Sequence, residues 1–148
     1  MADKEVAVNR RAFHDYFVDE HFEAGIVLTG TEVKSVRAGK VQLRDGYVRI
    51  DGGEAWLEGV HISPYTQGGY VNHDPTRRRK LLLHADEIAS LIGKVRQKGY
   101  TLVPLRVYFK RNHAKVDVGL ARGKRQYDKR QALAAADAKR EMARALKK

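Results

Sequence analysis

Residues 105–120, LRVYFKRNHAKVDVGL, alternate between apolar and other side chains on both sides of a central Asn112-His113. Successive side chains of a β-strand point to opposite faces, so a period of two is typical of a half-buried strand. The apolar positions that share one face are Leu105, Val107, Phe109, Val116, Val118 and Leu120. The stretch therefore predicts a hairpin of two antiparallel strands with one buried face.

Other segments upstream have the same character. Phe22, Ala24, Ile26 and Leu28 alternate with other residues in FEAGIVLTG and predict a further strand. YVRI and AWLEGV flank Asp51-Gly52-Gly53, a combination that is typical of a second hairpin.

Three helices are predicted among the strands: a turn or two within 9–17, a short helix over 31–39, and an amphipathic helix over 84–99. Many short antiparallel strands with few helices indicate a mainly β protein. We expect an OB-like antiparallel β-barrel with peripheral short helices. The weakly periodic segment 63–80 is interpreted as a long, mobile loop.

The positive charge is concentrated at one end of the chain. Of a net charge of +11 over 148 residues, residues 122–148 contribute ten Lys or Arg and three Asp or Glu, or +7. A strong basic excess points to a polyanionic partner, most often nucleic acid. We expect two parts: a barrel over 1–122 and a basic C-terminal tail over 123–148.

The tail is rich in helix formers but lacks an apolar face. Positions spaced by three and four share one face of a helix, and here that stripe is mostly basic: Lys129, Leu133, Ala136, Arg140, Arg144 and Lys147. An isolated helix of this length is marginal in water. We therefore expect a tail that is disordered alone and becomes helical when phosphates line its basic face.

Residue types needed for several kinds of chemistry are missing or scattered. The chain has no cysteine, and its six histidines show no zinc-binding spacing. No carboxylate cluster resembles a two-metal site, and there is no phosphate-binding glycine loop. We expect no enzyme activity, no cofactor and no metal. The apolar runs are too short to span a bilayer, so a cytoplasmic monomer without a membrane partner is expected.

Basic residues interleave with aromatic ones at three places: 10–17, 106–110 and 124–130. Lys and Arg attract phosphates, while Tyr stacks on unpaired bases or abuts ribose. The basic run Arg77-Arg78-Arg79-Lys80 adds a fourth candidate contact. The combination favours RNA as the partner.

Several motifs, in this order along the chain, resemble the small protein B (SmpB, SsrA-binding protein) family of bacteria. They are EAGIVLTGTEVKSVRAGKVQLRDGYV, GVHISPY, DPTRRRKLLLH, GYTLVPLRVYFK, KVDVGLARGK and YDKR. The resemblance runs from about Asn9 to Arg130, and beyond it the tail is similar in character only.

The resemblance implies an OB-like barrel that binds the tRNA-like domain of transfer-messenger RNA (tmRNA, or SsrA RNA). The complex, charged with alanine and carried by elongation factor Tu, enters the A site of stalled ribosomes. The tail lies in the empty mRNA channel of the small subunit, near the decoding centre. The nascent chain is then tagged for proteolysis, and the adaptor itself catalyses nothing.

Residue by residue, the family's RNA-facing positions match Asn9, Tyr16, Glu23 and Leu82. Charge adds further RNA-binding candidates: Arg10, Arg11, Arg77, Arg79 and Lys80. The candidates for ribosome binding in the tail are Gly123, Lys124, Arg125, Tyr127, Asp128, Lys129, Arg130, Arg140 and Arg144.

Two other functions remain open from the residues. A ribosomal-type protein or general RNA chaperone would have the same charge pattern without tmRNA specificity. A small RNA-processing enzyme or peptidyl-tRNA hydrolase would need an acid–base or metal cluster, which the sequence does not offer.

Overall fold

The computed structural model describes residues 4–67, 69, 71–97, 99–124 and 140. These residues form nine strands and three short helices. In chain order the elements are β1 (Lys4–Val8), α1 (Arg10–Asp15), β2 (Tyr16–Ile26), α2 (Gly30–Arg37), β3 (Val41–Gln42), β4 (Tyr47–Asp51), β5 (Glu54–Glu58), β6 (His61–Ile62), β7 (Arg79–Leu82), α3 (Ala85–Val95), β8 (Tyr100–Lys110) and β9 (His113–Gly123). The predicted mainly β class is confirmed.

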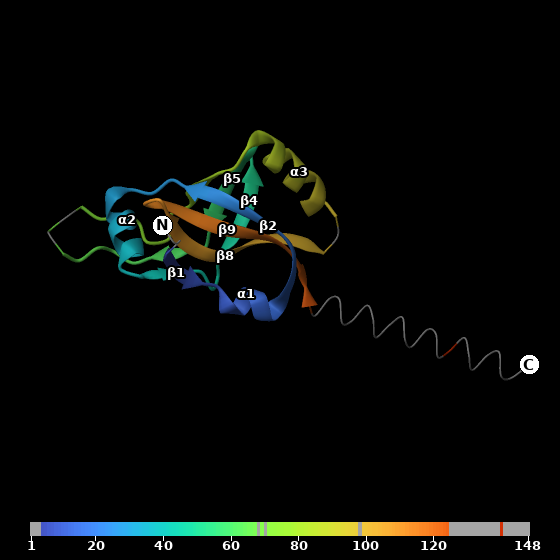
Figure 1. Cartoon of the computed structure of the whole chain (residues 1–148), viewed down its shortest axis with the longest axis horizontal. Helices are drawn as coiled ribbons and strands as arrows, with labels where there is room; N and C mark the ends of the chain where they lie inside the picture. The colour runs from blue at the N-terminus through green and yellow to red at the C-terminus, as the bar shows by residue number, and fades with distance from the viewer. Residues whose placement is uncertain (1–3, 68, 70, 98, 125–139, 141–148) are drawn as a thin grey trace, which may run out of the picture.

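Seven strands form one antiparallel sheet in the order β1-β8-β9-β2-β7-β5-β4, and β3 pairs separately with β6. The sheet curls, so that β4 at one edge lies beside β8 and the pair β4–β5 crosses behind β2, β8 and β9 (Figure 1). The curled sheet encloses the core, as in the predicted OB-like barrel.

Both predicted hairpins are present. β8 and β9 pair from Tyr100↔Arg122 to Lys110↔His113 and turn through Arg111 and Asn112, which have positive φ angles of 51° and 65°. Two central residues with positive φ are the requirement of the tight hairpin turn that suits twisted strands. Gly52 and Gly53 make the same kind of turn between β4 and β5, with φ of 60° and 74°.

Alternation along the strands places the core inside the barrel. Val116 and Val118 of β9 are fully buried, as are Leu81 of β7 and Leu57 of β5. A smaller apolar cluster under α1 contains Ala12, Val103, Leu105 and Ala121. The face that the sequence assigned to the interior of the 105–120 hairpin is therefore the interior.

The three predicted helices exist, and only α2 begins outside its expected range, by one residue. α2 begins with a reciprocal capping box in which the Thr29 hydroxyl accepts from the Glu32 amide and Glu32 accepts from the Thr29 amide. α3 packs Leu91 into the core. α2 lies at one end of the barrel, whereas α1 lies at the other end beside the end of β9 (Figure 1).

The predicted loop over 63–80 ends earlier than expected, because Arg79 and Lys80 already belong to β7. The loop is fastened to α2 and β6 by His73, whose two ring nitrogens lie 2.8 Å from Thr31 Oγ1 and 2.9 Å from the Ile62 carbonyl. Its predicted mobility stays a prediction.

The last strand reaches one residue into the predicted tail. Gly123 pairs with Tyr16 in the sheet, and Lys124 donates to the Phe13 carbonyl at 3.1 Å. The conformation predicted for the tail concerns residues that lie outside the described ones, apart from these two and the exposed Arg140. Within the described part of the chain, no helix has the length and apolar character needed to cross a membrane.

Candidate nucleic-acid interface

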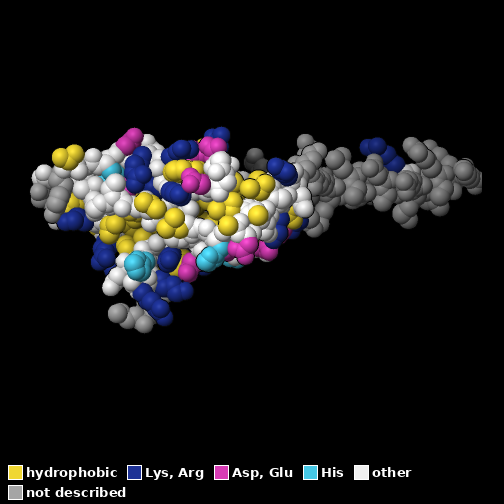
Figure 2. Space-filling view, turned by 90° about the horizontal axis from the view of Figure 1, so that it is seen from above, with side chains coloured by type: hydrophobic (Ala, Val, Ile, Leu, Met, Phe, Trp, Pro, Cys, Tyr) yellow, Lys and Arg dark blue, Asp and Glu magenta, His cyan; other side chains and the backbone are white. Residues whose placement is uncertain are grey.

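Four neighbouring strands, in the order β7, β2, β9 and β8, present a continuous solvent-facing surface. We call this surface the outer face and define it by Leu82, Glu23, Lys115, Tyr108 and Lys110. Their neighbours in sequence, such as Leu81, Ala24, Val116 and Phe109, are buried, so alternation alone directs these five side chains outward. On the side of the molecule seen in Figure 2, basic and acidic side chains are intermingled with apolar ones.

Glu23 is the central charged group of the outer face. Tyr108 donates its hydroxyl to Glu23 Oε2 at 2.5 Å, and Lys110 Nζ lies 3.5 Å from both carboxylate oxygens. The Tyr108 hydrogen bond is the largest effect on the pKa of Glu23 and lowers it. Burial, the next largest effect, acts to raise the pKa, but the charge and hydrogen bond of Lys110 and the charge of Lys115 add to the lowering, and the net pKa is lowered. Glu23 is thus an oriented, ionised acceptor on an exposed surface.

Leu82 lies beside Glu23 and is 54% exposed, which is unusual for a leucine in a strand. It pairs with Gly25 across the sheet, and a Cβ added at Gly25 would come within 3.3 Å of the Leu82 Cβ. The missing side chain at Gly25 therefore leaves Leu82 lying flat against the strand. The result is an open apolar spot next to a carboxylate.

Lys80 belongs to the same side of β7 and forms an ion pair with Glu54 at 2.9 Å. Arg78, just before the strand, lies over the Trp56 ring at 4.0 Å from its centroid. Both cations remain partly exposed, so they extend the basic and aromatic character of the outer face onto β5.

Arg10, Arg11 and Tyr16 lie elsewhere, at the α1 end of the barrel. Arg11 and Tyr16 line a hollow of about 280 Å³ together with Arg44 and Tyr47. Tyr16 and Glu23 are seven residue steps apart along β2, a distance of about 23 Å at ~3.3 Å per residue. The predicted RNA-binding residues therefore form two separate groups.

Asn9 does not face solvent, so this conformation offers no exposed side chain for its predicted role as an RNA contact, which stays a prediction. The residue is only 4% exposed. It caps α1 by accepting from the Ala12 amide at 3.1 Å and donates to the carbonyls of Pro104 and Leu43 at 2.9 and 3.2 Å. Asn9 instead fixes α1 against the barrel. It thereby helps to position Arg11 of α1 and Tyr16, which follows the helix.

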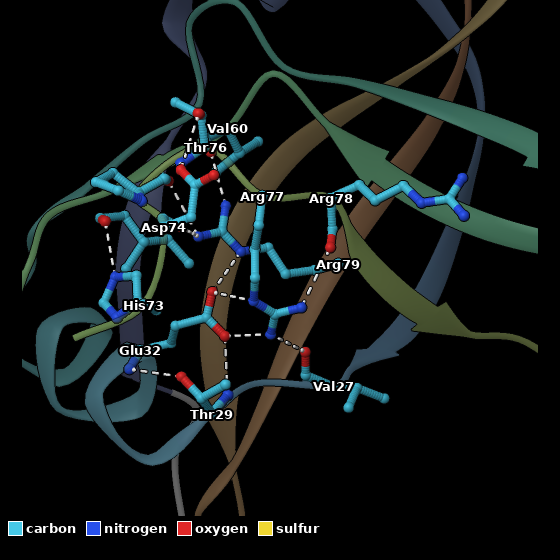
Figure 3. A network of polar contacts seen from close by, with 12 residues as sticks. Val27, Thr29, Glu32, Val60, His73, Asp74, Thr76, Arg77, Arg78 and Arg79 are labelled. Atoms are coloured by element: carbon cyan, nitrogen blue, oxygen red, sulfur yellow. Dashed lines mark hydrogen bonds and ion pairs between the residues drawn. The ribbon is translucent and has the colours of Figure 1, made fainter. Parts of the chain in front are cut away.

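Arg79, another predicted RNA contact, does not face solvent either, because its side chain is completely buried. It donates to Glu32 Oε2 at 2.6 Å and to the carbonyls of Val60 and Pro75 at 2.8 and 3.0 Å. Arg77 approaches the same carboxylate from the other side, with Nε 3.1 Å from Oε2 (Figure 3). Neither the buried Arg79 nor the paired Arg77 is a free cation for phosphates.

Glu32 is the anion at the centre of this network. Burial acts to raise the pKa of Glu32, but hydrogen bonds from Arg77, from the Thr29 amide and from Arg79 outweigh it, and the net pKa is lowered. The network therefore ties α2 to β7 and to the loop before it through an ionised, fully buried carboxylate. Its role is to hold the barrel together.

Two predicted tail residues belong to the α1 end. Gly123 ends β9, and Lys124 Nζ lies 5.3 Å from the centroid of the Phe17 ring as well as contacting the Phe13 carbonyl. The predictions for Arg125, Tyr127, Asp128, Lys129, Arg130 and Arg144 concern positions outside the described residues.

Sequence reasoning missed Arg44 and Tyr47, which complete the hollow at the α1 end. Tyr47 is 48% exposed. The only signal was its place at the start of a strand, in RDGYV, next to a basic residue and a turn. Neither residue is near Tyr16 in sequence, so only the fold brings the three together.

The fold and the outer face define a class: a small, OB-like β-barrel of the nucleic-acid-binding type. Exposed aromatic, aliphatic and basic side chains on a sheet are what such barrels offer to RNA. Among the described residues there is no group of three or more His, Asp or Glu placed to hold a metal ion.

Comparison with known proteins identifies the family. A sequence model of the family described as "SmpB protein" matches residues 6–148. An SsrA-binding protein of Roseiflexus castenholzii is 60% identical over 146 residues, covering 98% of this chain and 92% of the relative. An SsrA-binding protein of Bacillus cytotoxicus is 57% identical over 144 residues, covering 97% and 93%. The chain belongs to the SmpB family.

A solved structure described as "tmRNA-SmpB: a journey to the center of the bacterial ribosome" contains a similar chain. The two chains are 58% identical and superpose with a TM-score of 0.68, over 80% of this chain and 83% of the other. The barrel described here is thus the fold of that chain as well.

Proposed function

We propose that the protein binds the tRNA-like domain of tmRNA through its outer face and acts as a non-catalytic adaptor that rescues stalled ribosomes. The match to the SmpB family over residues 6–148 carries this proposal. The relatives are named for binding SsrA RNA. The outer face around Glu23 gives the proposal a chemical basis.

The outer face suits RNA that presents sugar and base edges. An ionised carboxylate repels phosphates, but it accepts hydrogen bonds from ribose 2′-hydroxyls and from base amino groups. Glu23 would act in this way, Leu82 would lie against a base or ribose, and Lys110 and Lys115 would contact flanking phosphates. The hollow with Tyr16 and Tyr47 would accept a second part of the same RNA.

The remaining steps extend this proposal to the ribosome. The adaptor would accompany alanine-charged tmRNA, carried by elongation factor Tu, into the A site of a ribosome without a codon. The basic tail would then lie in the empty mRNA channel of the small subunit, and translation would resume on tmRNA and tag the nascent chain for proteolysis. The excess of Lys and Arg beyond residue 124 supports a ribosomal RNA partner for the tail.

One affinity purification separates this proposal from a general RNA chaperone. When the tagged protein is recovered from bacterial cells, we expect a single tmRNA species to dominate the bound RNA. Sequencing the bound RNA gives the measurement, and a Glu23→Ala variant provides the control, because it should recover much less tmRNA. A broad mixture of ribosomal RNA fragments would favour the chaperone, and peptide release from peptidyl-tRNA by the protein alone would favour a hydrolase.

Tyr108→Phe is expected to weaken tmRNA binding several-fold, because it removes one hydrogen bond, worth about 0.5–1.5 kcal/mol, that orients Glu23. It should also raise the pKa of Glu23, since the Tyr108 hydroxyl is the main cause of the lowered pKa. As pH falls, the variant should lose binding at a higher pH than the unmodified protein. NMR titration of the Glu23 carboxyl group and binding assays across pH would check this.

A double-mutant cycle tests whether Tyr108 acts through Glu23. We expect Glu23→Gln with Tyr108→Phe to weaken binding by less than the sum of the single effects, because the two residues share one interaction. Tyr100→Phe is a matched control, since the Tyr100 hydroxyl also donates to a carboxylate, Asp19, at 2.9 Å, but at the other end of β8. Full additivity of the two single effects would mean that Tyr108 contacts RNA independently.

A further inference from the structure

A second basic surface lies at the end of the barrel capped by α2. Lys34 and Arg37 in the last turn of α2, and Lys40 just beyond it, line a hollow of about 370 Å³ together with Tyr65. We call this surface the basic end. No carboxylate is among the described residues that line the hollow.

Two of these cations are held by aromatic rings. Lys34 Nζ lies 5.4 Å from the centroid of the Tyr65 ring, and Arg37 Cζ lies 5.1 Å from the centroid of the Phe109 ring. The segment that carries Tyr65 is itself fixed, because the Tyr65 amide donates to Asn72 at 2.7 Å and Asn72 donates back to the Tyr65 carbonyl at 3.0 Å. The basic end is therefore a shaped surface.

Elsewhere on the barrel, several basic side chains are paired with carboxylates. Lys80 pairs with Glu54, Lys94 with Glu20, and Arg122 with Asp19. Arg37 and Lys40 have no carboxylate within ion-pair distance among residues 4–124 that the structure describes. The positive charges of Arg37 and Lys40 are thus left available to an external anion.

Complementing the dipole of α2 is the simplest alternative role for these cations. The last carbonyls of α2 are already satisfied by the amides of Ala38, Gly39 and Lys40, which donate to Lys34, Val36 and Ser35 at 2.9–3.1 Å. The dipole explains basic residues in the last turn. It does not explain an aromatic ring set across from them in a hollow without acidic groups.

The basic end meets the outer face at the edge of the barrel formed by the end of β8. Arg37 stacks on Phe109, which faces the core, whereas the next residue, Lys110, lies on the outer face and contacts Glu23. The basic end is also far from the point where the tail leaves the barrel, since β9 runs between them for ten residue steps, or about 33 Å at ~3.3 Å per residue (Figure 1). A ligand of the basic end therefore adjoins the RNA on the outer face and not the tail.

We propose that the basic end binds the phosphate–ribose backbone of the same tmRNA molecule that the outer face holds. Arg37 and Lys40 contact adjacent phosphates, and Tyr65 lies against a ribose or an unpaired base. This assignment rests on the proposed function and adds a second contact to it. It makes the tRNA-like domain span the sheet surface from Leu82 to α2.

The test is a salt titration of binding to the isolated tRNA-like domain of tmRNA with the variant Arg37→Gln/Lys40→Gln. Each phosphate contact contributes roughly 0.7–0.9 to the slope of log K against log salt. We expect about a tenfold loss of affinity at moderate salt and a slope reduced by about 1.4–1.8. The matched control, Arg49→Gln/Arg96→Gln, removes the same charge from exposed positions beside α3 and should leave the slope unchanged.

The outcomes separate the two proposals. If the unmodified protein binds tmRNA no better than unrelated RNA, both the proposed function and the proposed role of the basic end are overturned. If the protein binds tmRNA selectively and the Arg37/Lys40 variant behaves like the control, the basic end alone is overturned. The same holds if only ribosome association weakens, which would make ribosomal RNA the occupant. Lys40→Gln alone, at an exposed position beyond α2, keeps the test open if the double variant unfolds.

Discussion

Glu32→Gln is expected to lower the free energy of unfolding by about 3–5 kcal/mol, the usual cost of removing one partner from a buried ion pair. Arg79 is fully buried and would be left without its counter-charge. Arg77 loses the same partner. The capping box at the start of α2 is also weakened, because the Thr29 amide donates to the Glu32 carboxylate. Denaturant unfolding followed by circular dichroism measures the loss.

Glu54→Gln is the matched control for this prediction, because Glu54 also pairs with a basic residue of β7. The Glu54–Lys80 pair is 40–45% exposed, and exposed pairs contribute about 0–1 kcal/mol. Equal losses for the two variants would mean that the Glu32 network does not hold the barrel together.

Acid should remove the difference between Glu32→Gln and the unmodified protein. The pKa of Glu32 is lowered in the folded state from its ordinary value of 4.5. A carboxyl with a lowered folded pKa stabilises the fold above its unfolded pKa, and that contribution is lost as pH falls through the folded pKa. The gap in unfolding free energy should therefore be greatest near neutral pH and shrink below about pH 4.5.

The Glu32 network also shows where sequence reasoning reaches its limit. Arg77-Arg78-Arg79-Lys80 is a basic run that resembles a phosphate-binding segment, yet only Arg78 and Lys80 are directed outward. Alternation within β7 buries Arg79, and its counter-ion lies 47 positions earlier in α2. The first two residues of β7, Arg79 and Lys80, fall within the predicted loop over 63–80. Neither the burial of Arg79 nor its partner could therefore be inferred from the basic run.

Predictions succeeded where a local pattern determines the geometry. The alternation in 105–120 fixed which side chains face inward, and with it the orientation of Tyr108 and Lys110. Family resemblance added Glu23 and Leu82, which the structure places on the same face of neighbouring strands. The same resemblance also gave Asn9, which the fold buries as the cap of α1, so its role as an RNA contact stays a prediction.

Contacts between residues that lie far apart in the chain could not be predicted from the sequence. The hollow at the α1 end requires Tyr16 and Tyr47 to meet, and the basic end requires Arg37 to stack on Phe109 from β8. Each pair is brought together by closure of the barrel. Charge counts along the chain pointed to the tail and gave no reason to single out α2.

Removal of the tail is expected to abolish tagging on stalled ribosomes while leaving tmRNA binding nearly intact. The structure places the cut after Lys124, because Gly123 pairs with Tyr16 and Lys124 contacts the Phe13 carbonyl. The apolar core described here lies entirely before that point. The shortened protein should therefore unfold with about the same free energy as the full chain.

The reason for the split lies in the distribution of charge. Residues 125–148 hold eight Lys or Arg and three Asp or Glu, a net charge of +5. The proposed tmRNA contacts on the outer face, at the α1 end and at the basic end all precede residue 125. Without the tail, the complex would reach the ribosome but would have nothing to place in the empty mRNA channel.

Charge reversal within the full-length chain provides the sharper form of the experiment. Arg140→Glu/Arg144→Glu changes two positions that are four apart and share one face of a helix. It should reproduce the defect in tagging, whereas Gln126→Glu/Gln131→Glu, which adds two acidic residues without removing a basic one, provides a milder comparison. A reconstituted tagging assay on ribosomes stalled at the end of an mRNA measures tagging, and a gel-shift assay with tmRNA measures binding. Loss of tmRNA affinity on truncation would make the tail a primary binding element for tmRNA, and normal tagging by the reversed variant would remove the mRNA channel as its site.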